Sequence, residues 1–287
     1  MTGRGLRQDE ESPAAACPLS ITTFHGGQRT ILAIHGVTAY GLRFVRLAGY
    51  LSDWRWICPD LRGHGSSPQQ GPWTVDQHVA DLLPLVRDAR HPLVLVGSSF
   101  GGLIAWELAS KARGRVAALV LVDPVIGIPQ EVAAARRAEL LSMPTWADRA
   151  EALAFLLARR QAGGQWAAFL DVAVDLLASP DGRLERRRSR AASLQAWHEM
   201  ERPLNASGGD RYDGPTLLVE AGREMGSNVT PSLVAAFEAR LGEHLTHRVL
   251  DSVHNIVNEE PETLATAIRE YLDDPTIAAA VRGTSHA

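Results

Sequence analysis

LVLVGSSFGGLIAW, residues 93–106, joins a strand pattern to a helical pattern through the motif G-x-S-x-G. Strand-forming residues occupy 93–96, and apolar residues at helical spacing follow the motif without a break. A turn this tight leaves no space for side chains at its two outer positions. It also holds the central serine in a strained backbone conformation with the hydroxyl exposed. Ser99 is therefore the predicted nucleophile.

The rest of the chain alternates short apolar runs with helical patterns. Predicted strands cover 30–34, 54–58, 93–96, 116–122, 216–219 and 246–250, and predicted helices cover 41–51, 75–86, 103–112, 232–241 and 262–272. Continuous apolar strands separated by helices indicate a parallel sheet that is covered on both faces. The predicted fold class is therefore α/β, with a doubly wound, mostly parallel sheet.

Residues 125–210 interrupt this alternation. The segment has no convincing strand, and helical patterns cover 131–141, 147–160, 165–177 and 183–201. We expect a helical lid inserted over the carboxyl edge of the sheet, with 207–209 as the return linker. The predicted domain plan is a flexible N-terminus (1–20), an α/β core (21–124 and 211–274), the lid (125–210) and a C-terminal tail (275–287).

Three tryptophans of the predicted lid could line a substrate pocket beneath it, namely Trp146, Trp166 and Trp197. Packing among the lid's own helices is the alternative for each of them. The same segment carries a basic cluster, Arg186–Arg188 with Arg190. A cluster this small is expected to be a solvated helix face.

The composition is ordinary for a soluble globular protein. Hydrophobic residues make up 45% and charged residues 22% of the 287 residues, and the net charge of −4 gives no reason to expect nucleic acid or a membrane as a partner. No apolar run approaches the ~18 residues that span a bilayer, and the first residues show no signal-peptide pattern. The two cysteines, Cys17 and Cys58, form no disulfide framework, so we expect a reducing, cytoplasmic location. The oligomeric state cannot be read from the sequence.

Three further motifs accompany the turn at Ser99, in a fixed order along the chain. They are IHGV at 34–37, PDLRGHGSS at 59–67 and DSVHN at 251–255. The first resembles the His-Gly oxyanion strand end of the α/β-hydrolase fold superfamily. The second resembles that family's D-x-R-G-x-G-x-S loop, and the third its late loop with the catalytic histidine. The resemblance runs from about residue 29 to 272 and implies a serine esterase or lactonase with a helical lid.

A serine nucleophile needs a base within hydrogen-bond reach, and the base needs an acid to orient it. In this fold the order along the chain is nucleophile, acid, base, so the base is a late histidine. His254 follows the last predicted strand, at the carboxyl edge where parallel sheets place their sites. His244 and His247 flank the start of that strand, and His286 lies in the predicted tail. His254 is therefore the predicted base.

Two positions compete for the acid. Asp123 directly follows the predicted strand 116–122, at the same edge of the sheet as Ser99. Glu224 lies in the loop after 216–219, where most family members carry the acid, although this loop contains no aspartate. We favour Asp123, with Glu224 as the alternative and Glu220 as a third choice.

The resemblance implies that the backbone N–H groups of Val37 and Phe100 hold the oxyanion. It implies no cofactor. His35 is expected to be structural, and His35 and His64 lack carboxylate or thiolate neighbours at ligand spacing, so no metal site is expected.

The expected function is hydrolysis of a small carboxylic ester or lactone with an apolar acyl or alcohol part, through an acyl-enzyme intermediate. The same three residues could also cleave a carbon–carbon bond of the meta-cleavage type, perform cofactor-free perhydrolysis or cleave a thioester. A ligand-binding member of the fold without catalysis is a further alternative, because fold does not determine function.

Overall fold

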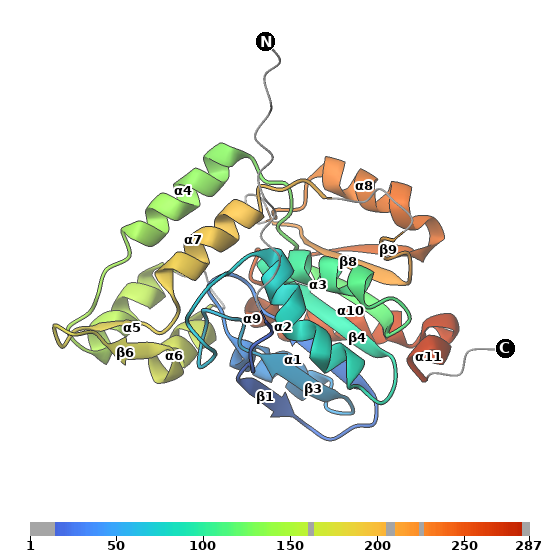
Figure 1. Ribbon diagram of the computed structural model, residues 1–287, viewed down its shortest axis with the longest axis horizontal. Coiled ribbons are helices and arrows are strands. Elements are labelled where there is room, and N and C mark those ends of the chain that lie inside the picture. Colours follow the sequence, from blue (N-terminus) through green and yellow to red (C-terminus); the bar gives the residue numbers. More distant parts are fainter. Residues whose placement is uncertain (1–14, 160–163, 205–209, 224–226, 283–287) are drawn as a thin grey trace, which may run out of the picture.

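A computed structural model describes residues 15–159, 164–204, 210–223 and 227–282. Its centre is a seven-stranded sheet in the order β1-β3-β2-β4-β5-β8-β9, in which β1 runs antiparallel to β3 and every other pair is parallel (Figure 1). The strands are β1 (Ile21–Phe24), β2 (Thr30–Ile34), β3 (Arg55–Pro59), β4 (Leu93–Ser98), β5 (Val116–Val122), β8 (Thr216–Ala221) and β9 (Leu245–Leu250). The predicted mostly parallel α/β sheet is confirmed, and β1 is an additional edge strand.

Helices cover both faces of this sheet (Figure 1). One face carries α2 (Val75–Arg87), α3 (Phe100–Lys111) and α8 (Pro231–Leu241), and the other carries α1 (Val45–Tyr50), α9 (Ile256–Glu259), α10 (Pro261–Leu272) and α11 (Pro275–Arg282). Successive residues of a strand point to opposite faces. Leu32 and Ile34 of β2 therefore join the core on the first side, and Ile31 and Ala33 join the core on the second.

The segment between β5 and β8 forms α4 (Gln130–Leu141), α5 (Arg149–Ala158), α6 (Gln165–Val174) and α7 (Arg190–Glu199). Below, these four are called the inserted helices. They lie to one side of the sheet, with α4 beside α7 and α5 beside α6 (Figure 1). The return linker predicted at 207–209 lies outside the described residues.

A small hairpin overlaps the end of the helix predicted at 165–177 and the start of the helix predicted at 183–201, in a segment for which the sequence predicts no strand. Its strands are β6 (Leu176–Ala178) and β7 (Leu184–Arg186). Ser179 N–H donates to Arg183 O at 2.7 Å, and Gly182, with φ +80°, donates to Ser179 O at 2.9 Å. Pro180 inside this turn has no N–H for a helical hydrogen bond, so the helical pattern on either side cannot continue through it.

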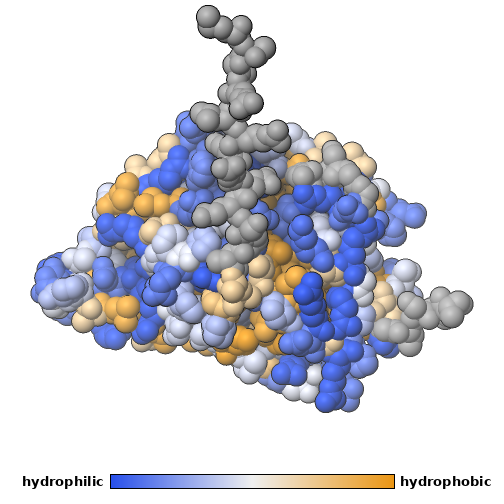
Figure 2. Space-filling view, viewed as in Figure 1, coloured by the Kyte–Doolittle hydropathy of each residue, from blue (hydrophilic) through white to orange (hydrophobic). Residues whose placement is uncertain are grey.

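Residues 275–282, assigned to a tail from the sequence, form α11, whose Ile277 and Val281 are buried in the second core. No helix of the described ranges is long and apolar enough to cross a bilayer. Figure 2 shows hydrophilic residues over most of one face, with hydrophobic residues in smaller patches. One such patch lies over α4, where Val132 and Leu141 are exposed.

Candidate active site

Ser99 stands between β4 and α3 in a backbone conformation that few residues adopt, with φ +57° and ψ −121°. The two glycines of the motif make this turn possible. A Cβ on Gly97 would lie 2.3 Å from the Gly101 carbonyl oxygen, and a Cβ on Gly101 would lie 2.1 Å from the carbonyl oxygen of Ile34. Neither position can therefore carry a side chain, which explains the spacing of the G-x-S-x-G motif.

His254 reaches Ser99 from the turn that follows β9. Its Nε2 lies 3.0 Å from Ser99 Oγ, and its Nδ1 lies 2.5 Å from Asp123 Oδ2. The two contacts fix the ring tautomer, because a proton on Nδ1 donates to the carboxylate and leaves the Nε2 lone pair facing the serine hydroxyl. The structure thus brings the predicted nucleophile, base and favoured acid into one hydrogen-bonded chain.

Asp123 is fully buried at the end of β5, with φ +43°. Its backbone N–H donates to Val219 O at 2.7 Å, which ties this strained residue to β8. Besides His254, its carboxylate accepts from Ala221 N–H at 3.0 Å, Ser227 Oγ at 2.7 Å and Asn228 N–H at 3.2 Å. Four donors thus surround this buried carboxylate and fix its orientation toward the ring of His254.

The other two candidate acids are placed differently. Glu220 lies on β8, and its Oε2 is 3.0 Å from Nε2 of His247 on β9. It is therefore paired with a histidine other than His254. Glu224 lies outside the described residues.

Asn228 is a site residue that the sequence did not single out. Its Nδ2 lies 2.9 Å from Nδ1 of His254. A ring nitrogen that donates its proton to Asp123 has no lone pair for an amide N–H, so we expect the amide of Asn228 to present its oxygen to the ring. The available signal was its place in the loop after β8, at the same edge of the sheet as Ser99 and Asp123.

His35 has the expected structural role. Its Nδ1 donates to Gly36 O at 2.8 Å, and its Nε2 accepts from Leu61 N–H at 2.9 Å. Burial lowers the pKa of His35 well below 6.5, so the ring is neutral. Among the described residues, no group of three or more His, Cys, Asp or Glu side chains is arranged to hold a metal ion.

The two predicted oxyanion donors lie in segments that adjoin Ser99. Phe100 is the first residue of α3, where a backbone N–H has no partner within the helix. Val37 follows Gly36, whose backbone passes so close that an added Cβ would lie 3.1 Å from Ser99 Cβ. The N-terminus of α3, with its partial positive charge, and the backbone at Gly36 therefore both lie close to the serine hydroxyl.

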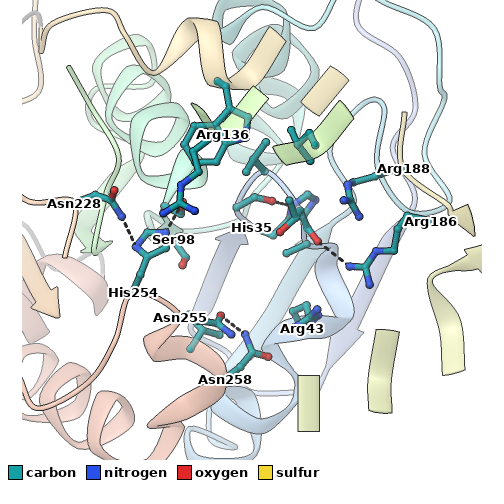
Figure 3. Close-up of a pocket in the computed structure, with 18 of the residues that line it drawn as sticks. His35, Arg43, Ser98, Arg136, Arg186, Arg188, Asn228, His254, Asn255 and Asn258 are labelled. Carbon is teal, nitrogen blue, oxygen red and sulfur yellow. Dashed lines mark hydrogen bonds between the residues drawn. The ribbon is translucent and has the colours of Figure 1, made fainter. Parts of the chain in front are cut away.

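A cavity of about 500 Å³ opens at Ser99 and His254 (Figure 3). This volume suits a small organic ligand. The inserted helices contribute Leu140, Leu156 and Trp197 to its lining.

Of the three tryptophans predicted to line a pocket, Trp197 lines this cavity. Trp146 is instead buried among the inserted helices, with its ring centroid 5.6 Å from that of Phe155. Trp166 on α6 is 41% exposed. Neither belongs to the described residues that line the cavity.

The basic cluster is not a solvated helix face. The side chains of Arg186 and Arg188 are only 10% and 7% exposed, and both line the cavity, whereas Arg190 is exposed. Arg186 is the last residue of β7, and Arg188 lies in the bend between β7 and α7. The fold turns both side chains toward the cavity.

The sheet order, the strained serine turn and the hydrogen-bonded chain behind it define a class of protein. The chain belongs to the alpha/beta hydrolase fold family, which matches residues 29–261. Among characterised relatives it is 36% identical over 253 residues to "Lipase LipV" of Mycobacterium tuberculosis, over 86% of this chain and 94% of the lipase.

Solved structures show the same similarity. The structure of E-2-(acetamidomethylene)succinate hydrolase has a TM-score of 0.79 and 25% identity, and the match covers 89% of this chain and 95% of that one. An esterase from Exiguobacterium antarcticum has a TM-score of 0.69 at 15% identity, with 89% and 96% covered, and this similarity concerns the fold alone. The chain is thus a hydrolase of this fold, similar to lipases and esterases.

Proposed function

We propose that this chain is a serine hydrolase that cleaves a small carboxylic ester or lactone through an acyl-enzyme intermediate. The observation that carries the proposal is the continuous hydrogen-bonded chain from Ser99 through His254 to Asp123, which opens into the cavity. The similarity to a lipase supports ester cleavage in particular.

In the first half-reaction, Ser99 Oγ attacks the ester carbonyl carbon while His254 Nε2 takes the hydroxyl proton. The carbonyl oxygen becomes an oxyanion, which the N–H groups of Val37 and Phe100 stabilise; one such donor contributes on the order of 3 kcal/mol. Asp123 stabilises the imidazolium that forms. His254 then passes its proton to the leaving alkoxide, and the acyl group stays on Ser99.

In the second half-reaction, water enters beside His254, which takes one of its protons as the oxygen attacks the acyl carbon. The same two N–H groups hold the second oxyanion. Collapse of this intermediate breaks the bond to Ser99 Oγ, which recovers its proton from His254. A lactone would give a single hydroxy acid instead of an acid and an alcohol.

A cytoplasmic location stays a prediction from the sequence.

Active-site labelling tests the proposal. A fluorophosphonate probe should add one covalent group to the wild-type protein, as measured by intact mass, and none to Ser99→Ala. The matched control is Ser98→Ala, which removes the neighbouring hydroxyl and should still be labelled. A wild-type protein that stays unlabelled, or labelling that persists in Ser99→Ala, would refute the serine mechanism and favour a ligand-binding role.

Turnover gives the second test. Wild-type protein should release p-nitrophenol from short-chain p-nitrophenyl esters, and Ser99→Ala should reduce kcat by about 10⁴-fold or more. Equal activity of the two proteins would show that the observed hydrolysis arises elsewhere.

A further inference from the structure

A buried cluster of charges lies beside the cavity, and its two signs do not balance. It holds three arginines and two aspartates, Arg43, Arg186, Arg188, Asp171 and Asp175. Arg43 pairs with Asp171, and Arg186 lies 2.6 Å from an oxygen of Asp171 and 2.8 Å from an oxygen of Asp175. Both carboxylates are thereby engaged by the first two arginines, so one positive charge is left over.

Arg188 is the arginine without a close partner. Its Nη1 lies 4.0 Å from Asp175 Oδ2, has no hydrogen-bond partner, and belongs to a side chain that is 7% exposed. Burial, and then the neighbouring Arg186, lower the pKa of Arg188 to about 9, which still leaves a cation at neutral pH. Figure 3 shows its side chain directed from the segment between β7 and α7 toward the cavity.

A buried arginine with a free donor is costly unless something pairs with it. Removing a guanidinium from water is unfavourable, and a stable protein normally surrounds such a group with acceptors. Arg188 is one of the residues that line the cavity. The missing acceptor is therefore expected to come from a ligand.

The other charged side chains that line the cavity are also mostly positive. Five arginines line it, Arg43, Arg136, Arg159, Arg186 and Arg188, and the one acidic side chain among its described lining residues is Glu139. Arg136 lies 3.1 Å from Glu139, and Arg159 also pairs with that carboxylate. This basic cavity contrasts with the net charge of −4 for the whole chain. It is also far more polar than the apolar pocket expected from the sequence.

We propose that the substrate carries a free carboxylate, which Arg188 binds while the ester carbonyl lies at Ser99. The substrate class is a monoester of a dicarboxylic acid, or another ester whose acyl or alcohol part ends in a carboxylate. A guanidinium offers two parallel N–H donors that match a carboxylate, which fixes orientation as well as affinity. This inference rests on the proposed ester hydrolysis, and Arg188 takes no part in the bond-breaking steps.

Matched substrates test the proposal. The probes are mono-p-nitrophenyl adipate, pimelate and suberate, which end in a carboxylate, and their methyl esters, which are neutral and otherwise alike. At the best chain length, wild-type kcat/KM should favour the anion by about 10- to 100-fold. Arg188→Met should bring this ratio close to one, mainly through a higher KM for the anion. The matched control Arg190→Met removes an exposed arginine two residues away and should keep the wild-type ratio.

Two results would overturn the anion site while leaving ester hydrolysis intact. One is a wild-type protein that cleaves the neutral methyl esters as well as or better than the anions. The other is an Arg188→Met protein that keeps the wild-type preference. Absence of any cleavage, together with no fluorophosphonate labelling, would instead be the failure of the proposed function.

A binding measurement tests whether Arg188 binds an anion even if the protein cleaves no ester. Suberate itself, at about tenfold above its Kd, should raise the Tm of Ser99→Ala by about 2–4 °C and should not raise that of Ser99→Ala with Arg188→Met. No shift in Ser99→Ala would overturn the proposal. Without ligand, Arg188→Met should be at least as stable as wild type, since the change balances the charges of the cluster. A marked fall in its Tm would assign Arg188 to the stability of the fold and would also overturn the proposal.

Discussion

Replacement of Asp123 by asparagine tests how this carboxylate orients the imidazole ring of His254. All four partners of this carboxylate are donors, with His254 at 2.5 Å and Ser227 at 2.7 Å the closest, followed by the N–H groups of Ala221 and Asn228. An amide has an acceptor at one of its two positions and an NH₂ donor at the other. Asparagine must therefore turn its NH₂ either toward the Oδ1 partners or toward the ring of His254.

The loss of activity follows from that choice. With the NH₂ group facing the ring, the lone pair moves to Nδ1 and the proton to Nε2, so the ring cannot accept the proton of Ser99. An Asp-to-Asn change of this kind in a serine protease lowers kcat about 10⁴-fold, and we expect a similar loss here, equivalent to about 5.5 kcal/mol of activation free energy. KM should change little, because Asp123 is fully buried behind the ring.

The assay is steady-state hydrolysis of a p-nitrophenyl ester, with the Tm of each variant measured to confirm folding. Glu224→Gln is the matched control, since it makes the same chemical change at the alternative acid. The reasoning would be refuted if Asp123→Asn kept activity within tenfold of wild type while Glu224→Gln lost it by orders of magnitude.

Three further predictions concern other parts of the structure. Gly101→Ala puts a Cβ 2.1 Å from Ile34 O and should lower the unfolding free energy by about 3 kcal/mol in urea denaturation. Gly49→Ala in α1, with nothing within 4 Å of the added Cβ, should raise it by up to ~1 kcal/mol; equal effects of the two would contradict this account. Burial lowers the pKa of His78 from 6.5 to about 3, so the unfolded chain takes up that proton first as the pH falls. His78 alone should cost about 3 kcal/mol of stability between pH ~6.5 and pH ~4.5, and buried His35 and His64, whose pKa values are also lowered, add to that loss. His78→Leu should remove the share of His78, and an unchanged pH dependence of the unfolding free energy would contradict this account. Asp171→Asn leaves three buried arginines with one aspartate and should cost about 3–5 kcal/mol, and an unchanged Tm would argue against this charge balance.

The features that could be predicted from sequence are those set by local geometry. Gly97 and Gly101 mark the turn because nearby backbone atoms exclude their side chains. These atoms are the carbonyl oxygen of Gly101 in the case of Gly97, and the carbonyl oxygen of Ile34, on the neighbouring strand β2, in the case of Gly101. The ends of parallel strands share one edge of the sheet, so Ser99, Asp123 and His254 could be expected to meet once their strands were located. The register of β4 against β5, with Ser98 opposite Val122, brings the first two together.

The features that could not be predicted depend on distant partners. The sequence predicts Arg188 on the surface, as part of a small basic cluster. Its burial depends on carboxylates and helices that the fold brings around it. Trp146 lies in the predicted lid, which left a pocket role and packing within the lid both open, and its position is set by Phe155 and the hairpin β6–β7. Asn228 has no motif around it, and its contact with His254 spans 26 residues.

The position of Asn228 has a consequence for how this reaction centre can change over evolutionary time. Its side chain and that of Asp123 approach the same ring nitrogen from two different strand ends, β8 and β5. Asn228→Asp would supply a second carboxylate there, and Asp123→Asn combined with Asn228→Asp should regain part of the kcat that Asp123→Asn loses. A double variant as slow as Asp123→Asn would show that position 228 cannot align the ring. A lineage could thus pass through an ancestor with an acid at both positions and transfer the orienting role from the end of β5 to the loop after β8.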